Sequence, residues 1–96
     1  MLTQKQKRFL KSIAHTLKPV VITGEGGISE GVLREIDLSI EHHELIKVRV
    51  NADDRDSRQE MIQAICSHTG AELVQSIGHI ALLYRAAKKP SLKLPV

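Results

Sequence analysis

The ten residues 20–29 constrain the fold more than any other part of the chain. Their first four, with the sequence VVIT, are β-branched, which is typical of a short buried strand. Three glycines follow within the sequence GEGG, and glycine turns freely through positive φ while another backbone or a ligand approaches closely. Ser29 is a suitable N-cap for a helix, since apolar residues recur every three or four positions over residues 32–40. The stretch therefore predicts a strand, a glycine loop and a helix N-terminus, where backbone N–H groups and the helix dipole favour an anion such as phosphate.

The length and composition indicate one small domain with few aromatic side chains. The 96 residues are 42% hydrophobic, which suits a single folded core. Phe9 and Tyr84 are the only aromatic residues, too few for a module that stacks bases on aromatic rings. The sequence shows neither a signal peptide nor an apolar run near the roughly 18 residues that span a bilayer. Cys66 has no second cysteine for a disulfide and fits a reducing compartment, so we expect a cytoplasmic protein without membrane association.

Charge is segregated along the chain, although the net charge is only +3. Residues 1–24 contain five basic and no acidic side chains, and residues 85–96 contain four basic and no acidic ones. Residues 25–84 contain five basic and eleven acidic side chains. This pattern predicts a basic face built from the two chain ends, for which nucleic acid is the usual partner. The alternative is that terminal lysines only keep a small protein soluble.

The first predicted helix begins after Thr3, a suitable cap, and extends to about residue 17, before Pro19. Apolar residues at three- to four-residue spacing give it a buried stripe. Its basic residues share one solvent-side line at Lys7, Lys11, His15 and Lys18. Like charges at this spacing oppose the helix mildly, which favours a role in ligand binding over a merely solvated face.

The remaining elements follow from the apolar pattern. Residues 30–42 form the second predicted helix, and residues 45–50 alternate as a half-buried strand that puts Lys47 and Arg49 on the face opposite to its inward side chains. A third helix is capped by Asp56 or Ser57 and stops at Gly70.

The chain then closes with two strands and a tail. Residues 73–77 and 80–84 are joined by Gly78-His79, a signal for a type II′ hairpin. The predicted order is α-β-α-β-α-β-β, an α/β fold in which helices pack on a four-stranded mixed sheet with right-handed crossovers and a final antiparallel strand. We expect a single domain over residues 1–85 and a basic, flexible tail over residues 86–96.

No constellation of catalytic or metal-binding side chains is recognisable. Adjacent His42 and His43 point to different helix faces and have no cysteine pair beside them. Asp53, Asp54 and Asp56 resemble half of a calcium loop, but the glycine and the distal glutamate are missing from their required positions. We therefore expect no enzyme, no metal, no cofactor and no small-molecule substrate.

The glycine loop itself has two interpretations. Gly24-Glu25-Gly26-Gly27 is not a P-loop, because no Gly-Lys-Ser/Thr follows, and Ser29 stands where a dinucleotide-binding loop requires a small glycine. It remains a G-x-x-G loop at a helix start, which clamps the nucleic-acid backbone in KH modules. Glycine patterns of this kind are also common in structural turns. The basic helix that leads directly into the preceding strand favours the RNA-binding interpretation.

Four segments match the sequence pattern of a known family. They are LKPVV at residues 17–21, G-x-x-G at 24–27 followed by SEGV at 29–32, EHHELIKV at 41–48, and I-G-x-x-x-L-x-Y-R at 77–85. These segments resemble the YhbY family, the bacterial stand-alone CRM domains (chloroplast RNA splicing and ribosome maturation). The resemblance extends from Gln4 to about Arg85, nearly the whole chain.

The resemblance implies a fold similar to the C-terminal domain of translation initiation factor three. It also implies an RNA-binding protein, associated with precursors of the large ribosomal subunit, that assists ribosome assembly. We expect the protein to be a monomer. In the family the glycine loop and the neighbouring basic surface are the RNA contacts. The corresponding residues here are Gly24, Glu25, Gly26 and Gly27, with a basic patch of Lys5, Lys7, Arg8, Lys11 and Lys18.

A second function is compatible with the same sequence. The acidic middle of the chain suits a module that docks on a ribosomal protein or assembly factor without direct RNA contact. Salt-sensitive binding to naked RNA separates the two possibilities.

Overall fold

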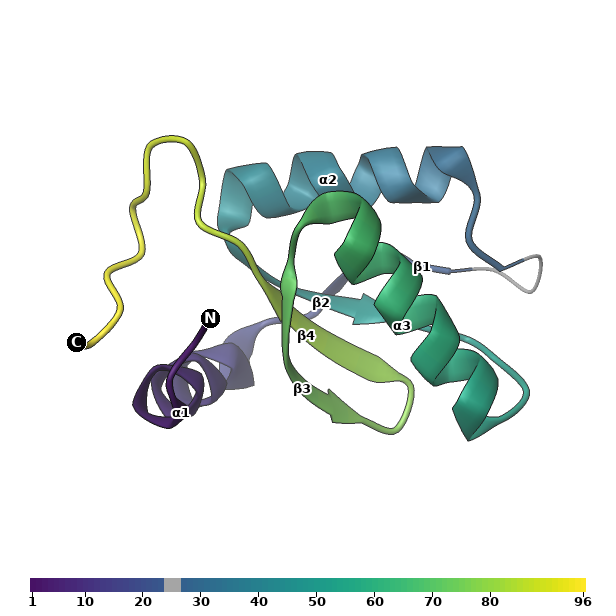
Figure 1. Ribbon diagram of the computed structural model, residues 1–96, viewed down its shortest axis with the longest axis horizontal. Coiled ribbons are helices and arrows are strands. Elements are labelled where there is room, and N and C mark those ends of the chain that lie inside the picture. Colours follow the sequence, from purple (N-terminus) through teal and green to yellow (C-terminus); the bar gives the residue numbers. More distant parts are fainter. Residues whose placement is uncertain (24–26) are drawn as a thin grey trace.

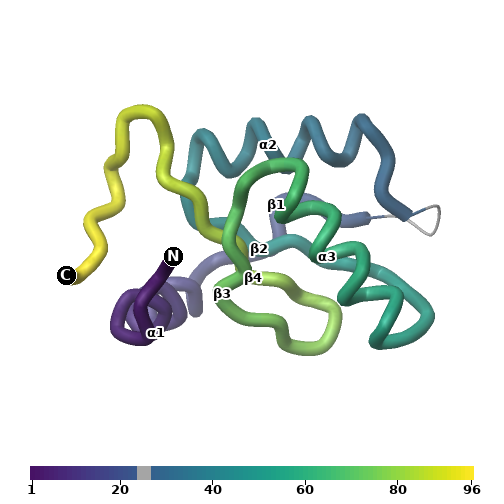
Figure 2. The backbone as a smooth tube through the Cα atoms, viewed as in Figure 1, coloured from purple at the N-terminus to yellow at the C-terminus, as the bar shows by residue number. Residues whose placement is uncertain are grey.

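The computed structural model describes residues 1–23 and 27–96 as three helices, a short 3₁₀ turn and four strands (Figures 1 and 2). In chain order these are α1 (Gln4–Ile13), η1 (Ala14–Thr16), β1 (Pro19–Ile22), α2 (Glu30–His43), β2 (Leu45–Arg49), α3 (Arg55–Thr69), β3 (Glu72–Ile77) and β4 (Ile80–Tyr84). The predicted α-β-α-β-α-β-β order and the mixed sheet are confirmed.

The four strands form one sheet in the order β1-β2-β4-β3. β1 and β2 are parallel, whereas β4 is antiparallel to both β2 and β3. The antiparallel last strand was predicted, and the structure adds that it lies inside the sheet, between β2 and β3. The hairpin turns at Gly78, which has φ 56, whereas the φ of His79 is not positive. A type II′ turn requires this combination.

Helix starts follow the predicted caps in two of three cases. Thr3 accepts a hydrogen bond from the Gln6 backbone N–H, and the Gln6 side chain returns one to Thr3, so the first helix begins with a capping box. Ser29 caps α2 through the Val32 N–H at 3.1 Å. The expected cap of α3 at Asp56 or Ser57 is wrong: Asp54 is the cap.

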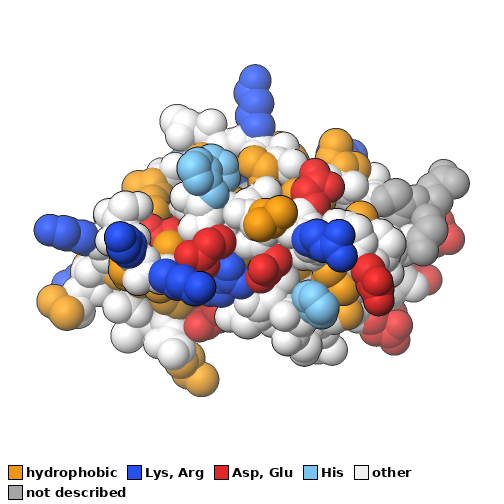
Figure 3. Space-filling view, turned by 90° about the horizontal axis from the view of Figure 1, so that it is seen from above, with side chains coloured by type: hydrophobic (Ala, Val, Ile, Leu, Met, Phe, Trp, Pro, Cys, Tyr) orange, Lys and Arg blue, Asp and Glu red, His pale blue; other side chains and the backbone are white. Residues whose placement is uncertain are grey.

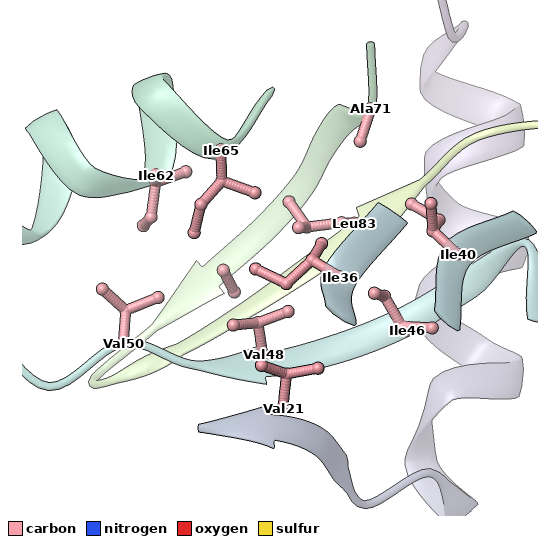
Figure 4. Packing of buried hydrophobic residues seen from close by; sticks show 11 residues of the cluster. Val21, Ile36, Ile40, Ile46, Val48, Val50, Ile62, Ile65, Ala71 and Leu83 are labelled. Atoms are coloured by element: carbon pink, nitrogen blue, oxygen red, sulfur yellow. The ribbon is translucent and has the colours of Figure 1, made fainter. Parts of the chain in front are cut away.

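The larger core lies between the sheet and the helices α2 and α3, which cover the same face (Figure 1). Buried side chains from both helices meet alternate residues of the strands (Figure 4). The cluster consists of Val21, Ile36, Ile40, Ile46, Val48, Val50, Ile62, Ile65, Ala71, Ala81 and Leu83. The inward positions 46, 48 and 50 of the strand predicted over residues 45–50 are therefore confirmed, although β2 itself ends at Arg49.

A smaller core lies on the other face of the sheet, under α1. Leu10 and Ala14 pack there against Leu45, Val74 and Leu82. Leu82 belongs to this core and Leu83 to the larger one, as expected for neighbouring residues of a strand that alternate between two faces. Leu92 and Leu94 of the tail also pack against it.

The tail is attached to the domain through a buried carboxylate, Glu44, which is 1% exposed and has φ 67 at the end of α2. Its two oxygens accept hydrogen bonds from the backbone N–H groups of Ala87 (3.0 Å), Ser91 (2.8 Å) and Leu92 (2.9 Å) and from the Ser91 hydroxyl (2.9 Å). Burial raises the pKa of Glu44, but these four hydrogen bonds together outweigh it and lower the pKa to about 2. We propose from these contacts a docked tail in place of the expected flexible one.

Arg85 ties the end of β4 to both helices of the larger layer. Its guanidinium donates to the Asp37 carboxylate (2.6 Å), the Thr69 carbonyl (2.7 Å) and the Glu41 carboxylate (3.1 Å). The arginine side chain is only 20% exposed, so its charge is met by two carboxylates and backbone oxygens rather than by water.

Candidate nucleic-acid interface

The predicted glycine loop is only partly described. Gly24, Glu25 and Gly26 lie outside the described residues. Gly27 follows them with φ 84, in the left-handed region that favours glycine, and no atom lies within 4 Å of where a Cβ would be. The need for glycine at this position is therefore conformational, and the space around it is open.

A polar hollow of about 600 Å³ adjoins Gly27. It lies where β1 and β2 end and α3 begins, and is lined also by Asn51, Ala52, Asp53, Ser57, Met61 and His79. Asn51 is held in place because its backbone N–H and its side-chain amide both donate to Thr23, at 3.0 and 3.1 Å. The hollow offers hydrogen-bonding groups, but the Asp53 carboxylate in its wall disfavours an anion inside it.

The acidic character of this rim is reinforced by the cap of α3. The backbone N–H of Ser57 donates to Asp54 at 2.7 Å and is the largest cause that lowers the pKa of that carboxyl. Asp54 therefore remains negatively charged beside the hollow. The hollow therefore suits uncharged polar groups better than an anion.

The predicted basic residues lie on α1 and just after it. Lys5, Arg8 and Lys18 are exposed, while Lys7 and Lys11 are half-buried. Figure 1 places α1 at one end of the longest axis, which measures 38 Å, and the start of α2 at the other end. The structure therefore does not gather α1 and Gly27 into one compact cluster.

The C-terminal tail brings further basic residues to α1. The Lys5 ammonium donates to the Val96 carbonyl at 3.3 Å, and the Gln6 side chain donates to the Pro95 carbonyl at 3.0 Å. Figure 2 shows the tail ending beside α1 and the N-terminus. The two basic segments of the chain therefore lie next to each other, and exposed Lys93 lies in the same segment.

Two hollows flank η1 on the side of the sheet that α1 occupies. One, of about 390 Å³, has Lys18, His43 and Lys47 among its lining residues. The other, of about 260 Å³, has Lys11, His15 and Lys47. Among the described residues, the linings of both hollows contain no Asp or Glu. This part of the surface therefore attracts anions.

Lys47 lies between the two hollows and was not among the predicted site residues. Its ammonium donates to the Leu17 carbonyl at 3.2 Å, which holds the lysine against the connection from η1 to β1. Exposed Arg49 is two residues further along β2 on the same face. The alternating pattern of β2 correctly predicted that both point away from the larger core, but it does not show that α1 leaves this part of the sheet face open, so it could not assign them to the site.

The opposite surface has a different charge pattern. Figure 3 views the molecule from the α2 side and shows acidic and basic side chains interspersed. Glu30, Arg34, Asp37 and His68 line a shallow hollow there. The acidic middle of the sequence thus supplies a surface of mixed sign, unlike the lysine-lined hollows beside η1.

Groups suited to other chemistry are sparse in the described part of the chain. No group of three or more His, Cys, Asp or Glu residues there could hold a metal ion. Burial, and secondarily the charge of Glu72, raises the pKa of the half-buried Cys66 thiol, which keeps the thiol protonated and unreactive. Among the described helices, none has the length and apolar character needed to cross a membrane.

Comparison with known proteins gives consistent matches over the whole length. An RNA-binding protein of Haemophilus influenzae is 51% identical over 94 residues, which cover 98% of this chain and 95% of the relative. The probable RNA-binding protein YqeI of Bacillus subtilis is 38% identical, with 99% and 100% covered. The solution structure of the hypothetical protein SAV1595 from Staphylococcus aureus superposes with a TM-score of 0.85 at 42% identity, covering 99% of this chain and all of that one.

The sequence profile of the CRS1 / YhbY (CRM) domain matches residues 2–85. This range contains all three helices and all four strands. The chain therefore belongs to the CRS1 / YhbY (CRM) domain family.

Proposed function

We propose that the protein binds RNA and assists assembly of the large ribosomal subunit, in the cytoplasm and without catalysing a reaction. The observation that carries the proposal is the lysine-lined surface around α1 and η1, whose hollows contain Lys11, Lys18 and Lys47 without an acidic neighbour among their lining residues. Such a surface attracts the phosphate backbone regardless of sequence. The names of the relatives in bacteria support RNA as the partner.

The glycine loop is the second proposed contact. Backbone N–H groups around Gly26, Gly27 and Ile28 would meet phosphates at the N-terminus of α2, where the helix dipole favours negative charge. Gly27 supports this because its φ of 84 favours glycine, which has no side chain, and because the space beside it is open.

The separation of the two contacts favours a structured RNA. Because α1 and the start of α2 lie at opposite ends of a molecule 38 Å long, a ligand that reaches both must extend over a comparable distance. Double-stranded RNA is recognised over such lengths by its shape and backbone. We therefore propose that structured rRNA of the large-subunit precursor spans the protein.

The basic surface can be tested by charge reversal. The double substitution Lys7→Glu and Lys11→Glu should weaken binding to a large-subunit rRNA fragment and flatten its salt dependence, because each lost phosphate contact removes about 0.7–0.9 from the slope of log K against log salt. Arg34→Glu with Arg55→Glu is the matched control, since it makes the same charge change on α2 and α3. Equal effects of the two double variants would show that only net charge matters and would refute a localised surface.

The loop can be tested by comparing two glycines. Gly27→Ala should weaken RNA binding while the fold remains, whereas Gly31→Ala should not, because Gly31 lies in the first turn of α2 without a positive φ and faces only the Ser29 hydroxyl at 3.8 Å. Circular dichroism and urea unfolding would check the fold of both variants. Unchanged affinity in folded Gly27→Ala protein would remove the loop from the interface.

The cellular target can be found by crosslinking in cells and sequencing the attached RNA. Reads concentrated at defined large-subunit rRNA sites and enriched in precursor particles would support the assembly role. Reads spread over all abundant RNAs would leave a general RNA binder. Absence of crosslinks, despite co-sedimentation with ribosomal particles, would favour docking on a ribosomal protein or assembly factor through the mixed-sign surface of α2.

A further inference from the structure

The sheet face on the α1 side is only half covered by the helix. The strand register places Leu45 opposite Tyr84, and this row packs in the smaller core with Leu10 and Ala14 of the helical segment. Two residues further along β2, Lys47 lies opposite Leu82, at the margin of η1. Beyond that margin none of the described helices covers the face, where Ile22 and Ile77 are exposed.

A row of four side chains crosses the uncovered half. Ile22 pairs with Arg49, Arg49 with Ile80, and Ile80 with Ile77, so the row spans all four strands. Val21, Val48 and Ala81, their strand neighbours, belong to the larger core, which places the row on the α1 side. We name Ile22, Arg49, Ile80 and Ile77 the open sheet row.

The open sheet row exposes more apolar surface than folding requires. Ile22 is 60% and Ile77 65% exposed, and both belong to outer strands of the sheet. A row of isoleucines around one arginine forms a flat surface that can cover the faces of planar groups, and the arginine guanidinium can itself stack on such groups.

The hollow of about 260 Å³ lies against this row and contributes polar groups. Ile77 and Ile80 form part of its wall, together with Leu82. Lys11, His15, Lys47 and Gln75 supply its polar groups. The volume lies just below the roughly 300 Å³ at which pockets for drug-sized ligands begin, so the hollow has room for a group as small as one nucleobase. The Gln75 amide can donate to and accept from such a base.

Apolar side chains beside cations fit unpaired RNA better than a duplex. In a duplex the base faces are stacked on one another and only the backbone and groove edges are available, so exposed isoleucines would gain little. In an unpaired strand the bases can lie on the isoleucines and the arginine while the lysines meet the phosphates. The described lining of the hollow contains no Asp or Glu. This favours RNA, which is a polyanion, over a protein partner whose surface carries both acidic and basic side chains.

We propose that the open sheet row and the adjoining hollow bind an unpaired segment of RNA, with one base in the hollow. The proposal rests on the proposed RNA-binding function and adds to it a site for unpaired nucleotides, which shares the hollow of about 260 Å³ with the proposed basic surface and extends it onto the open sheet row, away from the glycine loop. A structured rRNA with a bulge or single-stranded flank would then occupy both kinds of surface.

An uncharged substitution separates this site from general electrostatic attraction. Ile77→Gln removes apolar surface without changing the charge, and Leu38→Gln on α2 is its matched control because the two side chains are 65% and 66% exposed. The probes are a fluorescently labelled ten-nucleotide single-stranded RNA of mixed sequence and a 16-base-pair RNA duplex. Affinities are measured by fluorescence anisotropy over a range of salt concentrations, with the oligomeric state followed by sedimentation.

The expected result is that Ile77→Gln weakens single-strand binding about fivefold or more while its salt slope and the duplex affinity stay unchanged, since covering the exposed isoleucine side chain with a base contributes about 1 kcal/mol or more, a factor of about five. Leu38→Gln should match the parent protein on both probes. Unchanged single-strand affinity in Ile77→Gln would overturn the proposal while duplex binding upholds the proposed function. Binding of neither probe by the parent protein would refute both. A dimer of the parent protein that Ile77→Gln dissociates would assign the row to a second copy of the chain and overturn the proposal.

Discussion

Replacing Glu44 with glutamine should weaken the attachment of the tail, because it exchanges one carboxylate oxygen for an NH₂ group. The carboxylate accepts three hydrogen bonds at Oε1 and one, from the Ala87 N–H, at Oε2. A glutamine that keeps its oxygen at the first position turns an NH₂ group toward the Ala87 N–H, so two donors face each other. Both side chains carry a Cβ, so the backbone strain at φ 67 is the same in the two proteins and cancels in the comparison.

The magnitude follows from the pKa of the carboxyl. Lowering it from 4.5 to about 2 corresponds to about 3 kcal/mol of preference for the charged form in the folded protein, at 1.36 kcal/mol for each pKa unit. Because the folded-state pKa is below the unfolded one, this stabilisation is complete above about pH 5. It is lost as the pH falls toward 2, where the carboxyl becomes protonated.

Urea unfolding at several pH values tests the argument. Above pH 5, Glu44→Gln should lower the free energy of unfolding by about 3 kcal/mol, or release the tail while the rest stays folded. The difference from the parent protein should shrink toward zero near pH 2. Amide hydrogen exchange at Ala87, Ser91 and Leu92 distinguishes release of the tail from global unfolding.

A neighbouring acid provides the control. Glu41 also accepts a hydrogen bond from the tail, at the Lys88 N–H (3.0 Å), but its side chain is 41% exposed. Glu41→Gln should therefore cost under about 1 kcal/mol. If Glu44→Gln cost no more than Glu41→Gln, or kept the same loss of stability between pH 5 and 2 as the parent protein, the assigned role of the buried carboxylate would be wrong.

Three further predictions concern stability and reactivity. Ser29→Ala should lower the free energy of unfolding by about 1 kcal/mol in urea titrations, because the Val32 N–H loses its cap. Ile65→Ala should cost about 2–5 kcal/mol and lower the thermal midpoint, since the side chain is fully buried between α3 and the sheet. Cys66 should react with iodoacetamide at pH 8 much more slowly in the folded protein than in urea, because burial raises the pKa of its thiol; equal rates would contradict its placement.

Features set by nearby residues were predictable from the sequence. The caps Thr3 and Ser29, the alternation of β2 and the Gly78 turn each depend on a few consecutive positions, and the structure confirms them. The cap of α3 was assigned two or three residues late, because several Asp and Ser residues in a row can all cap and their order alone does not choose among them. Asp54 is the cap in the structure because its carboxylate accepts a hydrogen bond from the Ser57 backbone N–H in the first turn of α3.

Features set by distant residues had no local signal. The proline and lysine residues of the tail predict a mobile segment. Its backbone N–H groups nevertheless donate to Glu44, more than 40 residues earlier in the chain. The position of β4 inside the sheet likewise depends on pairing with two strands at once. The basic residues of α1 were assigned to the site from charge alone, whereas including Lys47 and Arg49 required knowing which part of the sheet face α1 leaves open.

The place of β4 between β2 and β3 has a consequence for how the protein is made. A ribosome that has synthesised residues 1–79 has completed β2 and β3, but in the finished sheet those strands never pair with each other. Each has an unsatisfied edge until residues 80–84 emerge, and the hydrogen bonds to Glu44 form only after the tail follows. The nascent chain therefore cannot close its sheet cotranslationally until residues 80–84 have emerged. A product terminated before β4 would have two open strand edges in addition to the outer edges of β1 and β3, and would be a ready substrate for aggregation or proteolysis.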